Sequence, residues 1–226
     1  MKRISLIVPC LNEEEAIPAF KQEIDRVFKE CLEGYAPELI FVDDGSTDRS
    51  LEMIKKMAEH SPEVKFISFS RNFGKEAAIY AGLEAATGDY AAVMDVDLQD
   101  PPSLLPDMLK AIEKEGYDCA GTRRVTRQGE PLLRSFFARA FYKTIHQISD
   151  TRIVDGARDY KLMTRPVLEA LLSLKEYNRF SKGLYEWVGF RTKWFEYENV
   201  ERVAGETKWS FFKLFLYSIE GIVAFS

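Results

Sequence analysis

The chain has few of the residues that most often carry redox, zinc or imidazole chemistry. It contains three cysteines and two histidines in 226 residues, none of them at a metal-ligand spacing. An odd number of widely separated cysteines favours reduced thiols in a cytosolic compartment over a disulfide framework. Neither His60 nor His146 lies in a motif typical of catalysis. We therefore expect any general base in this protein to be a carboxylate.

The sequence also lacks a secretory signal peptide and an excess of positive charge. Its first apolar run, Ile4 to Val8, is too short for a signal peptide and is followed at once by Pro9 and acidic residues. The net charge of −5 argues against a protein that binds nucleic acid through bulk positive charge. We find no repeats or low-complexity segments, and the length indicates one large domain or one domain with an appendage.

Apolar runs alternate with amphipathic segments through roughly the first 120 residues, which predicts an α/β fold. The predicted strands are 4–8, 38–42, 64–69 and 90–94. The predicted helices are 13–30 (capped by Asn12), 50–60, 75–86 and 103–115. Such alternation is typical of a mostly parallel central sheet flanked by helices on both faces. Loops after parallel strands gather at one sheet edge, so we expect four polar stretches to converge there: 9–13, 43–48, 70–74 and 95–99.

After residue 120 the alternation weakens, and 159–164 and 191–197 are predicted to be short strands. Leu132 to Ile148 has apolar residues at helical spacing in a strongly basic region. A basic cluster is usually a solvated face, but this apolar stripe favours contact with an anionic surface, or else a subunit interface. Trp209 to Phe225 is short and two-faced, which predicts an interfacial helix rather than a spanning one.

The most specific motif is Asp95-Val96-Asp97, which follows the apolar run Tyr90 to Met94 and precedes Gln99-Asp100-Pro101-Pro102. Residues at i and i+2 of a strand point to the same side. Two carboxylates placed in this way suit Mg²⁺ or Mn²⁺, which prefer oxygen ligands. The motif therefore predicts a site for a metal ion and a diphosphate.

Four weaker motifs each allow a structural and a functional interpretation. Asp44 is either part of a turn or an acceptor for a base or ribose. Glu13 is either a first-turn acid or a ligand. The loop 71–75 either starts a helix or binds phosphate. The stretch 202–208 is either a surface loop or a flexible clamp that places Arg202 and Lys208 on a diphosphate.

Together these stretches resemble the inverting glycosyltransferase family 2, which has the GT-A nucleotide-sugar-binding fold. Within it they are most similar to the polyprenyl-phosphate branch: dolichyl-phosphate mannosyltransferases and bacterial undecaprenyl-phosphate (bactoprenol) glycosyltransferases. The resemblance covers nearly the whole chain in order. The matching stretches are VPCLNEE (8–14), VDDGSTD (42–48), RNFGKE (71–76), DVDLQDPP (95–102), DYKLM (159–163), RFSKGL (179–184) and RVAGETKW (202–209).

The resemblance implies a role for each matching residue. The nucleoside would be held by Pro9, Leu11, Glu13, Val42 and Asp44. The metal would be held by Asp95, Asp97 and Gln99, with Val96 beside the diphosphate and Arg202 and Lys208 closing over it. Arg123 would lie near the acceptor phosphate, and Asp159 would take the catalytic-base position, with Asp97 as the second catalytic residue. Leu11 departs from the tyrosine often found there, and Thr207 replaces a frequent serine.

The predicted reaction moves a hexose, glucose or N-acetylglucosamine, from a UDP-sugar to undecaprenyl phosphate, for modification of the cell wall or a surface polysaccharide. The acceptor phosphate has a second pKa near ~6 and is largely dianionic at neutral pH. Asp159 therefore either takes a residual proton or only positions the acceptor. The alternatives are an enzyme like dolichyl-phosphate-mannose synthase that uses GDP-mannose, and a non-catalytic membrane-docking nucleotide-binding module. A nucleotidyltransferase is disfavoured because no G-x-G-x-R loop follows the first strand.

The resemblance also implies a domain organisation. Residues 1–200 would form the catalytic domain, with a membrane-facing helix at about 131–148. Residues 201–226 would form the phosphate-clamp loop and a juxtamembrane helix. The bactoprenol branch usually continues into two transmembrane helices, which are absent from this chain. We therefore expect the full-length protein to be anchored at the cytoplasmic face of the cell membrane, with a homo-oligomer as one option and no nucleic-acid partner.

Overall fold

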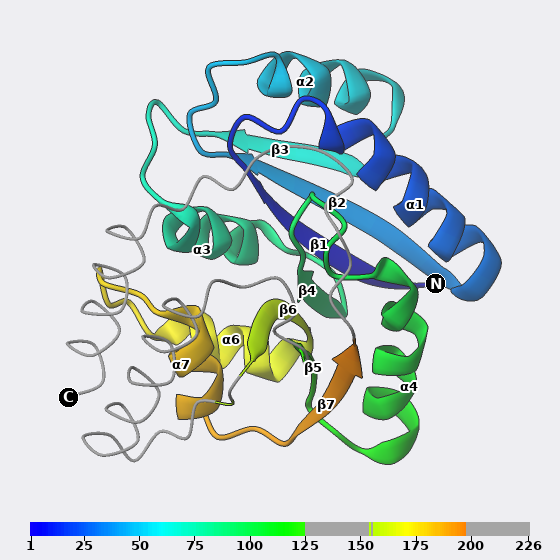
Figure 1. Ribbon diagram of the computed structural model, residues 1–226. Coiled ribbons are helices and arrows are strands. Elements are labelled where there is room, and N and C mark those ends of the chain that lie inside the picture. The colour runs from blue at the N-terminus through cyan, green and yellow to red at the C-terminus, as the bar shows by residue number, and fades with distance from the viewer. Residues whose placement is uncertain (125–153, 155, 198–226) are drawn as a thin grey trace.

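The computed structural model describes residues 1–124, 154 and 156–197 (Figure 1). Residues 125–153, 155 and 198–226 lie outside the described part. The predicted helices at 132–148 and 209–225 both fall there, as do Arg202 and Lys208. None of the described helices is long and apolar enough to cross a membrane.

The described residues form a seven-stranded sheet with the order β3-β2-β1-β4-β6-β5-β7. Every neighbouring pair is parallel except the two that involve β6, which runs antiparallel to both β4 and β5. The predicted mostly parallel sheet is therefore confirmed. The strands are β1 Lys2–Cys10, β2 Tyr35–Asp43, β3 Val64–Ser68, β4 Tyr90–Val93, β5 Cys119–Arg124, β6 Ala157–Thr164 and β7 Thr192–Tyr197.

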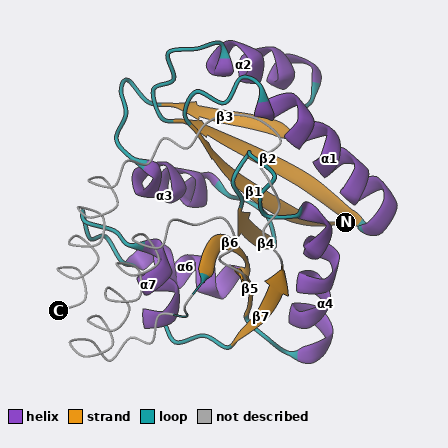
Figure 2. Ribbon diagram, in the orientation of Figure 1, coloured by secondary structure: helices purple, strands orange, loops and turns teal. Residues whose placement is uncertain are grey.

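Helices cover both faces of the sheet, as Figure 2 shows. On one face lie α1 (Ala16–Cys31), α2 (Ser50–His60) and α4 (Leu105–Glu115), the last preceded by a 3₁₀ turn, η1 (Pro102–Leu104). On the other face lie α3 (Lys75–Ala85), α6 (Arg165–Ser173) and α7 (Ser181–Trp187). The result is a three-layer α/β arrangement with one apolar cluster between each helix layer and the sheet.

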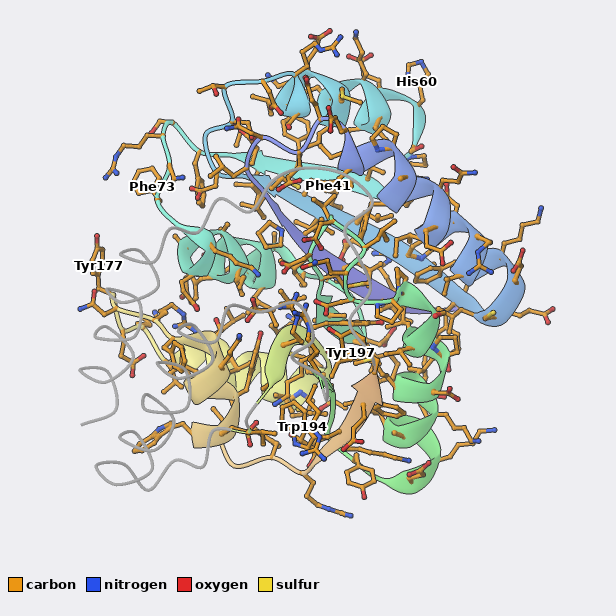
Figure 3. The ribbon with its side chains drawn as sticks, viewed as in Figure 1. Phe41, His60, Phe73, Tyr177, Trp194 and Tyr197 are labelled. Atoms are coloured by element: carbon orange, nitrogen blue, oxygen red, sulfur yellow. The ribbon has the colours of Figure 1, made fainter. Side chains whose placement is uncertain are left out.

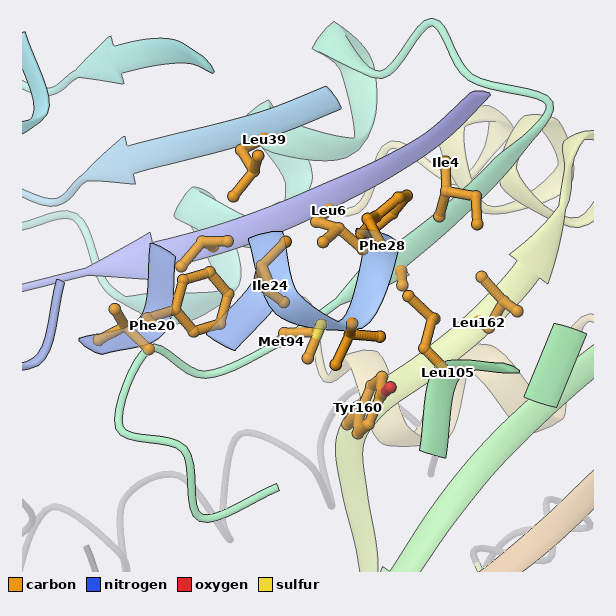
Figure 4. Close-up of a cluster of buried hydrophobic side chains, with 14 of the residues drawn as sticks. Ile4, Leu6, Phe20, Ile24, Phe28, Leu39, Met94, Leu105, Tyr160 and Leu162 are labelled. Atoms are coloured by element: carbon orange, nitrogen blue, oxygen red, sulfur yellow. The ribbon is translucent and has the colours of Figure 1, made fainter. Parts of the chain in front are cut away.

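The alternation of side chains along β1 explains the two clusters. Ile4 and Leu6 face α1 and α4, whereas Ile7 packs on the α3 side. Figure 4 shows Phe20 and Ile24 of α1 directed at the first of these clusters. Their spacing of four residues places both on one side of the helix. Burying each such side chain contributes about 1.5–3 kcal/mol to folding.

Several boundaries differ from those predicted. The first helix begins at Ala16 rather than at 13, and Asn12 is not its N-cap, because Asn12 and the residues after it are engaged by the loop that follows β2. Predicted helix 103–115 begins as the 3₁₀ turn η1. Strands β6 and β7 were predicted, but β5, α6 and α7 were not. The sequence of β5, CAGTRR, contains too few large apolar side chains to show strand periodicity.

Candidate active site

The loops after β1 and β2 are tied together at the carboxyl edge of the sheet. Cys10 pairs with Asp43 at the ends of these strands. Beyond that pair, the side-chain oxygen of Asn12 accepts a hydrogen bond from the Thr47 amide at 2.7 Å, and the Asn12 amide donates to Ser46 Oγ at 2.9 Å. The Glu13 amide donates to Ser50 Oγ at 2.7 Å. The predicted nucleoside loops are thus one hydrogen-bonded unit.

Asp44 fastens a third loop to this unit. Its carboxylate is buried and accepts hydrogen bonds from the amides of Phe73 at 2.7 Å and Gly74 at 3.0 Å. Burial raises the pKa of Asp44, and these two backbone donors act against that rise. Figure 3 labels Phe73 on this loop, between β3 and α3. The sequence left a turn role and a ligand role open for Asp44, and the structure shows a loop-holding role.

Gly45 allows these loops to approach closely. It adopts φ +73°, and a Cβ atom at this position would lie 2.6 Å from the backbone carbonyl carbon of Arg71. An L-residue with a side chain would therefore be strained in its own backbone and would collide with the neighbouring loop. The Gly45 in the DDGS stretch is explained by this contact.

The remaining predicted nucleoside residues are placed unequally. Pro9 and Leu11 are partly exposed at the sheet edge. Val42 is fully buried and packs in the cluster beneath α3. Val96, beside the expected diphosphate, is also buried.

Asp95 and Asp97 lie in a turn rather than on a strand. Strand β4 ends at Val93, so strand alternation does not orient these two carboxylates. Instead, Leu98 adopts φ +56°, and the Gln99 amide donates to Asp97 Oδ1 at 3.1 Å. Asp97 is 5% exposed. The predicted same-face strand geometry is therefore replaced by a tight turn that holds Asp97 inward.

Backbone strain in the described residues is concentrated at this edge. In that part of the chain, Asn12 and Leu98 are the non-glycine residues with positive φ, at +52° and +56°. One lies in the loop after β1 and the other in the loop after β4. Such conformations cost about 1–3 kcal/mol each and persist where surrounding contacts enforce them, often at functional sites. The strain supports a ligand-binding role for this edge.

Lys75, the first residue of α3, connects the two predicted catalytic regions. Its ammonium lies 2.6 Å from Asp95 Oδ1 and 2.5 Å from Asp159 Oδ2. Burial lowers the pKa of Lys75, but Asp159 and Asp95 raise it above its usual value. Burial by itself would raise the pKa of Asp159, but the neighbouring Lys75 and Lys182 hold this pKa well below the usual carboxyl range. Lys75 and Asp159 are therefore both charged at neutral pH.

Arg158 forms a second cationic contact with Asp95. Its guanidinium NH2 lies 3.8 Å from Asp95 Oδ2, and its Nε donates to Asp100 Oδ1 at 2.9 Å. Tyr197, at the end of β7, also donates to Asp100 (Figure 3). Burial would lower the pKa of Arg158, and the two carboxylates raise it instead. Asp95 is thus flanked by one cation on each oxygen.

Lys182 lies at the start of α7 and adds a third basic side chain to this group. Ser181, before it, is held by Glu76 of α3, which accepts from the Ser181 amide at 3.0 Å and its hydroxyl at 2.5 Å. Burial lowers the pKa of Lys182, and Arg158 and Lys75 lower it further against the attraction of Asp159. Within the described residues, Lys182 forms no ion pair.

Arg123 lies on β5, beside this group. Its guanidinium pairs with Glu196 of the neighbouring β7, and its buried Nε has no hydrogen-bond partner among the described residues. The register of β5 against β6 shifts between Gly121 and Arg123. Arg123 therefore lies on the strand next to the one that carries Asp159, but no hydrogen bond or ion pair joins these two side chains.

The structure thus joins Asp95 to Asp159 through Lys75, with Asp97 two residues from Asp95, and adds residues to which the sequence assigned no role. The missed residues are Arg158, Lys182, Asp100 and Tyr197. Arg158 had a local signal, because it precedes Asp159, and Lys182 lies in the matching stretch 179–184. Nothing in the sequence paired Asp100 with Tyr197, 97 positions apart.

The acidic pair suits a divalent cation in its chemistry. Asp95 and Asp97 offer carboxylate oxygens and Gln99 an amide oxygen, which are hard ligands. Both oxygens of Asp95 already attract cationic groups. No cluster of three or more His, Cys, Asp or Glu side chains that could hold a metal occurs in the described residues. A bound ion would therefore complete its coordination with water or substrate oxygens.

Comparison with known proteins identifies the family of the chain. The family model "Glycosyl transferase family 2" matches residues 5–172. CsbB of Bacillus subtilis (strain 168), whose name assigns it to the glycosyltransferases, is 44% identical over 99% of this chain and 67% of its own length. The "Prophage bactoprenol glucosyl transferase homolog" of Escherichia coli (strain K12) is 42% identical over 99% of this chain and 72% of its own.

Solved structures show the same fold at lower identity. Glucosyl-3-phosphoglycerate synthase from Mycobacterium tuberculosis, in complex with Mn²⁺, UDP-glucose and phosphoglyceric acid, has a TM-score of 0.63 at 20% identity, over 99% of this chain and 78% of its own. A mannosyltransferase from Pyrobaculum calidifontis, with GDP-mannose and Mn²⁺, has a TM-score of 0.57 at 21% identity, over 90% of this chain and 57% of its own.

The fold is of the GT-A type. The chain belongs to glycosyltransferase family 2, on the match to its family model and on the identity with its relatives.

Proposed function

We propose that the protein transfers glucose or N-acetylglucosamine from a UDP-sugar to undecaprenyl phosphate, with inversion at the anomeric carbon. The observation that carries this proposal is the position of Lys75 between Asp95 and Asp159. Asp95 belongs to the expected diphosphate side and Asp159 to the expected acceptor side. One ammonium in contact with both supports a single compact centre in which donor and acceptor meet.

The relatives support the choice of substrates. Proteins named for bactoprenol glucosyl transfer match almost the whole chain at 42% identity, which favours a polyprenyl phosphate as the acceptor. A structural neighbour carries UDP-glucose and Mn²⁺, which favours a UDP-sugar and a divalent cation. Membership of family 2 favours an enzyme over a non-catalytic nucleotide-binding module.

In the proposed reaction, an acceptor phosphate oxygen attacks the anomeric carbon as the bond from that carbon to the diphosphate breaks. The products are a glycosyl prenyl phosphate and a nucleoside diphosphate. Asp95, Asp97 and Gln99 would hold a divalent cation, which would supply positive charge to offset the charge of the departing diphosphate. Arg158, fixed by Asp100, adds a preorganised positive charge on that side.

Asp159 is proposed to position the acceptor rather than to remove its proton. Its carboxylate is bound to Lys75 and holds no proton at neutral pH. The acceptor phosphate is itself largely dianionic there. Lys75 and Lys182 would keep Asp159 from repelling that dianion. Asp159 would then orient Lys75 and Lys182, which would bind the acceptor phosphate.

We further propose that residues 1–200 form the catalytic domain and that residues 201–226 supply the phosphate clamp, with Arg202 and Lys208, and a juxtamembrane helix. The basic segment from Arg123 to Ile148 would face an anionic membrane surface, with Arg123 near the acceptor phosphate. The reaction would take place at the cytoplasmic face of the membrane. The basic character of that segment and the water-insoluble acceptor support this placement.

A donor screen tests the proposal. The protein is incubated with Mn²⁺, a short-chain prenyl phosphate and, in turn, UDP-glucose, UDP-N-acetylglucosamine and GDP-mannose, and the products are read by mass and anomeric configuration. We expect a UDP-derived hexosyl prenyl phosphate of inverted configuration. Product from GDP-mannose alone would establish the dolichyl-phosphate-mannose-synthase-like alternative, which the Pyrobaculum neighbour favours. Metal-dependent UDP binding without transfer would leave only a binding module.

A further inference from the structure

Lys75 is the one described cation in contact with both Asp95 and Asp159. Arg158 approaches Asp95, but no ion pair joins it to Asp159. Because one nitrogen hydrogen-bonds to both carboxylates, their near oxygens are close enough to repel each other strongly. Lys75 cancels that repulsion in the protein without ligand.

A divalent cation at Asp95 competes with this arrangement. Mg²⁺ and Mn²⁺ bind carboxylate oxygens directly, and Asp95 Oδ1 is already in contact with the Lys75 ammonium at 2.6 Å. Two cations on one carboxylate repel each other in a partly buried site, where solvent screening is weak. The ion and Lys75 therefore oppose each other at Asp95, whereas Asp159 remains available to Lys75.

The backbone around Lys75 is connected to the predicted nucleoside loops. The two residues before it, Phe73 and Gly74, donate their amides to Asp44. The residue after it, Glu76, holds Ser181 at the start of α7. Asp44 and Glu76 thus hold the backbone on the two sides of Lys75.

We propose that Lys75 is a positioning residue that holds Asp95 and Asp159 together before the donor binds and is displaced from Asp95 by the divalent cation. Its ammonium then serves Asp159 and the acceptor phosphate alone. The inference rests on the proposed function in its assignment of Asp95 to the metal. It goes beyond that function because metal binding at Asp95 would break the contact of Lys75 with Asp95 and leave Lys75 to bind Asp159 and the acceptor phosphate.

The test is the Mn²⁺ affinity of the protein without nucleotide, measured by titration calorimetry and by the electron paramagnetic resonance signal of free Mn²⁺. We expect Lys75→Met to bind Mn²⁺ about tenfold more tightly than the wild type, the scale of one neighbouring charge on an ionic equilibrium. Lys75→Arg keeps the charge and should stay within about twofold of the wild type.

Lys182→Met is the matched control, because it removes a nearby basic side chain that forms no ion pair with Asp95 or with any other described residue. We expect it to change Mn²⁺ affinity by less than about threefold. An equal gain in Mn²⁺ affinity in Lys75→Met and Lys182→Met would show a general effect of charge and would overturn the proposal. An unchanged Mn²⁺ affinity in Lys75→Met would also overturn it. Asp95→Asn should abolish binding in every background.

Loss of Lys75 leaves two facing carboxylates, which threatens folding. The double variant Lys75→Met/Asp159→Asn removes that repulsion, and it should bind Mn²⁺ more tightly than Asp159→Asn alone. Weaker Mn²⁺ binding by the double variant than by Asp159→Asn would also overturn the inference. Tighter Mn²⁺ binding by Lys75→Met in a protein that transfers no hexose from any donor would instead overturn the proposed function and leave the competition at Asp95 standing.

Discussion

The guanidinium of Arg158 is fixed by the carboxylate of Asp100, with Nε 2.9 Å from Oδ1, and this contact keeps its NH2 3.8 Å from Asp95. Asp100 is 1% exposed, and Tyr197 donates to the same oxygen. A buried carboxylate that holds an active-site cation has both a structural and a functional role. The two roles can be separated by mutation.

We expect Asp100→Asn to lower the free energy of unfolding by about 3 kcal/mol, because it leaves the charge of Arg158 without its buried partner. It should also slow transfer, since Arg158 is no longer directed at Asp95. Chemical denaturation and initial rates provide the two measurements. Tyr197→Phe is the matched control: it removes one hydrogen bond to Asp100 and should cost about 1 kcal/mol with little loss of rate. Equal rate losses in both variants would contradict a role that runs through Arg158.

Asp159→Asn should reduce transfer by the same factor at pH 6 and at pH 8. The pKa of Asp159 is held well below its usual range by Lys75 and Lys182 despite burial, so its protonation does not change between these values. Rates at both pH values, with saturating donor, check this expectation. Near-wild-type turnover above pH 8 together with a loss at pH 6 would show that Asp159 takes a proton from the acceptor.

Glu38 gives a prediction about stability that is independent of the site. Burial would raise its pKa, but hydrogen bonds from Lys65, Ser5 and Thr87 lower it to about 2. The pKa of Glu38 is lower in the folded protein than in the unfolded chain. Ionised Glu38 therefore stabilises the fold above about pH 4.5, and this stabilisation is lost as the pH falls toward 2. Glu38→Gln should therefore cost about 3 kcal/mol at pH 7 and progressively less in acid.

Denaturation curves of the wild type and Glu38→Gln at pH 7 and pH 3 provide the measurement. Lys65→Met is the control, because Lys65 is half exposed and its ion pair with Glu38 is partly screened. It should cost about 1 kcal/mol or less. A constant difference between wild type and Glu38→Gln across this pH range would refute the assignment.

Gly45→Ala should separate steric contact from backbone strain. Its Cβ would lie 2.6 Å from Arg71, whereas a Cβ at Gly34, which has φ +90°, meets nothing within 4 Å. We expect Gly34→Ala to cost about 1 kcal/mol from strain alone and Gly45→Ala about 2–3 kcal/mol. Only Gly45→Ala should weaken UDP binding, because it pushes apart the loops that carry Asp44 and Phe73. Thermal unfolding and calorimetry with UDP measure both effects.

The parts of the fold that could be predicted are those whose side chains repeat with a clear period. Helix α2 and strands β1 to β4 follow directly from their apolar spacing, and the convergence of Asp44 and Asp95 at one edge follows from parallel strands. Strand β5 could not be found, because Gly121 and Thr122 are small side chains that depend on Trp194 and Tyr160 as neighbours.

The sequence singled out the acids of the described site, but not the cations Arg158 and Lys182. Asp95 and Asp159 were marked by their motifs and by the family resemblance, whereas their connection depends on Lys75, at the start of α3, reaching Asp159 on β6. A sequence shows which residues carry charge but not which of them will neutralise one another across 84 positions. The sequence left the loop 71–75 open between a helix start and phosphate binding, and the structure begins α3 at Lys75 and places its ammonium between two carboxylates.

The reversed direction of β6 has a consequence for how the protein can vary. Since β5 ends and β6 begins at the same sheet edge, both ends of the connection between Arg124 and Ala157 are anchored beside Asp159. A change in the length of that connection would leave the register of the other strands intact. The half of the molecule that holds Asp44 would keep its form while the surroundings of Asp159 change, so under the proposed function one sheet could serve different acceptors through changes in a single connection.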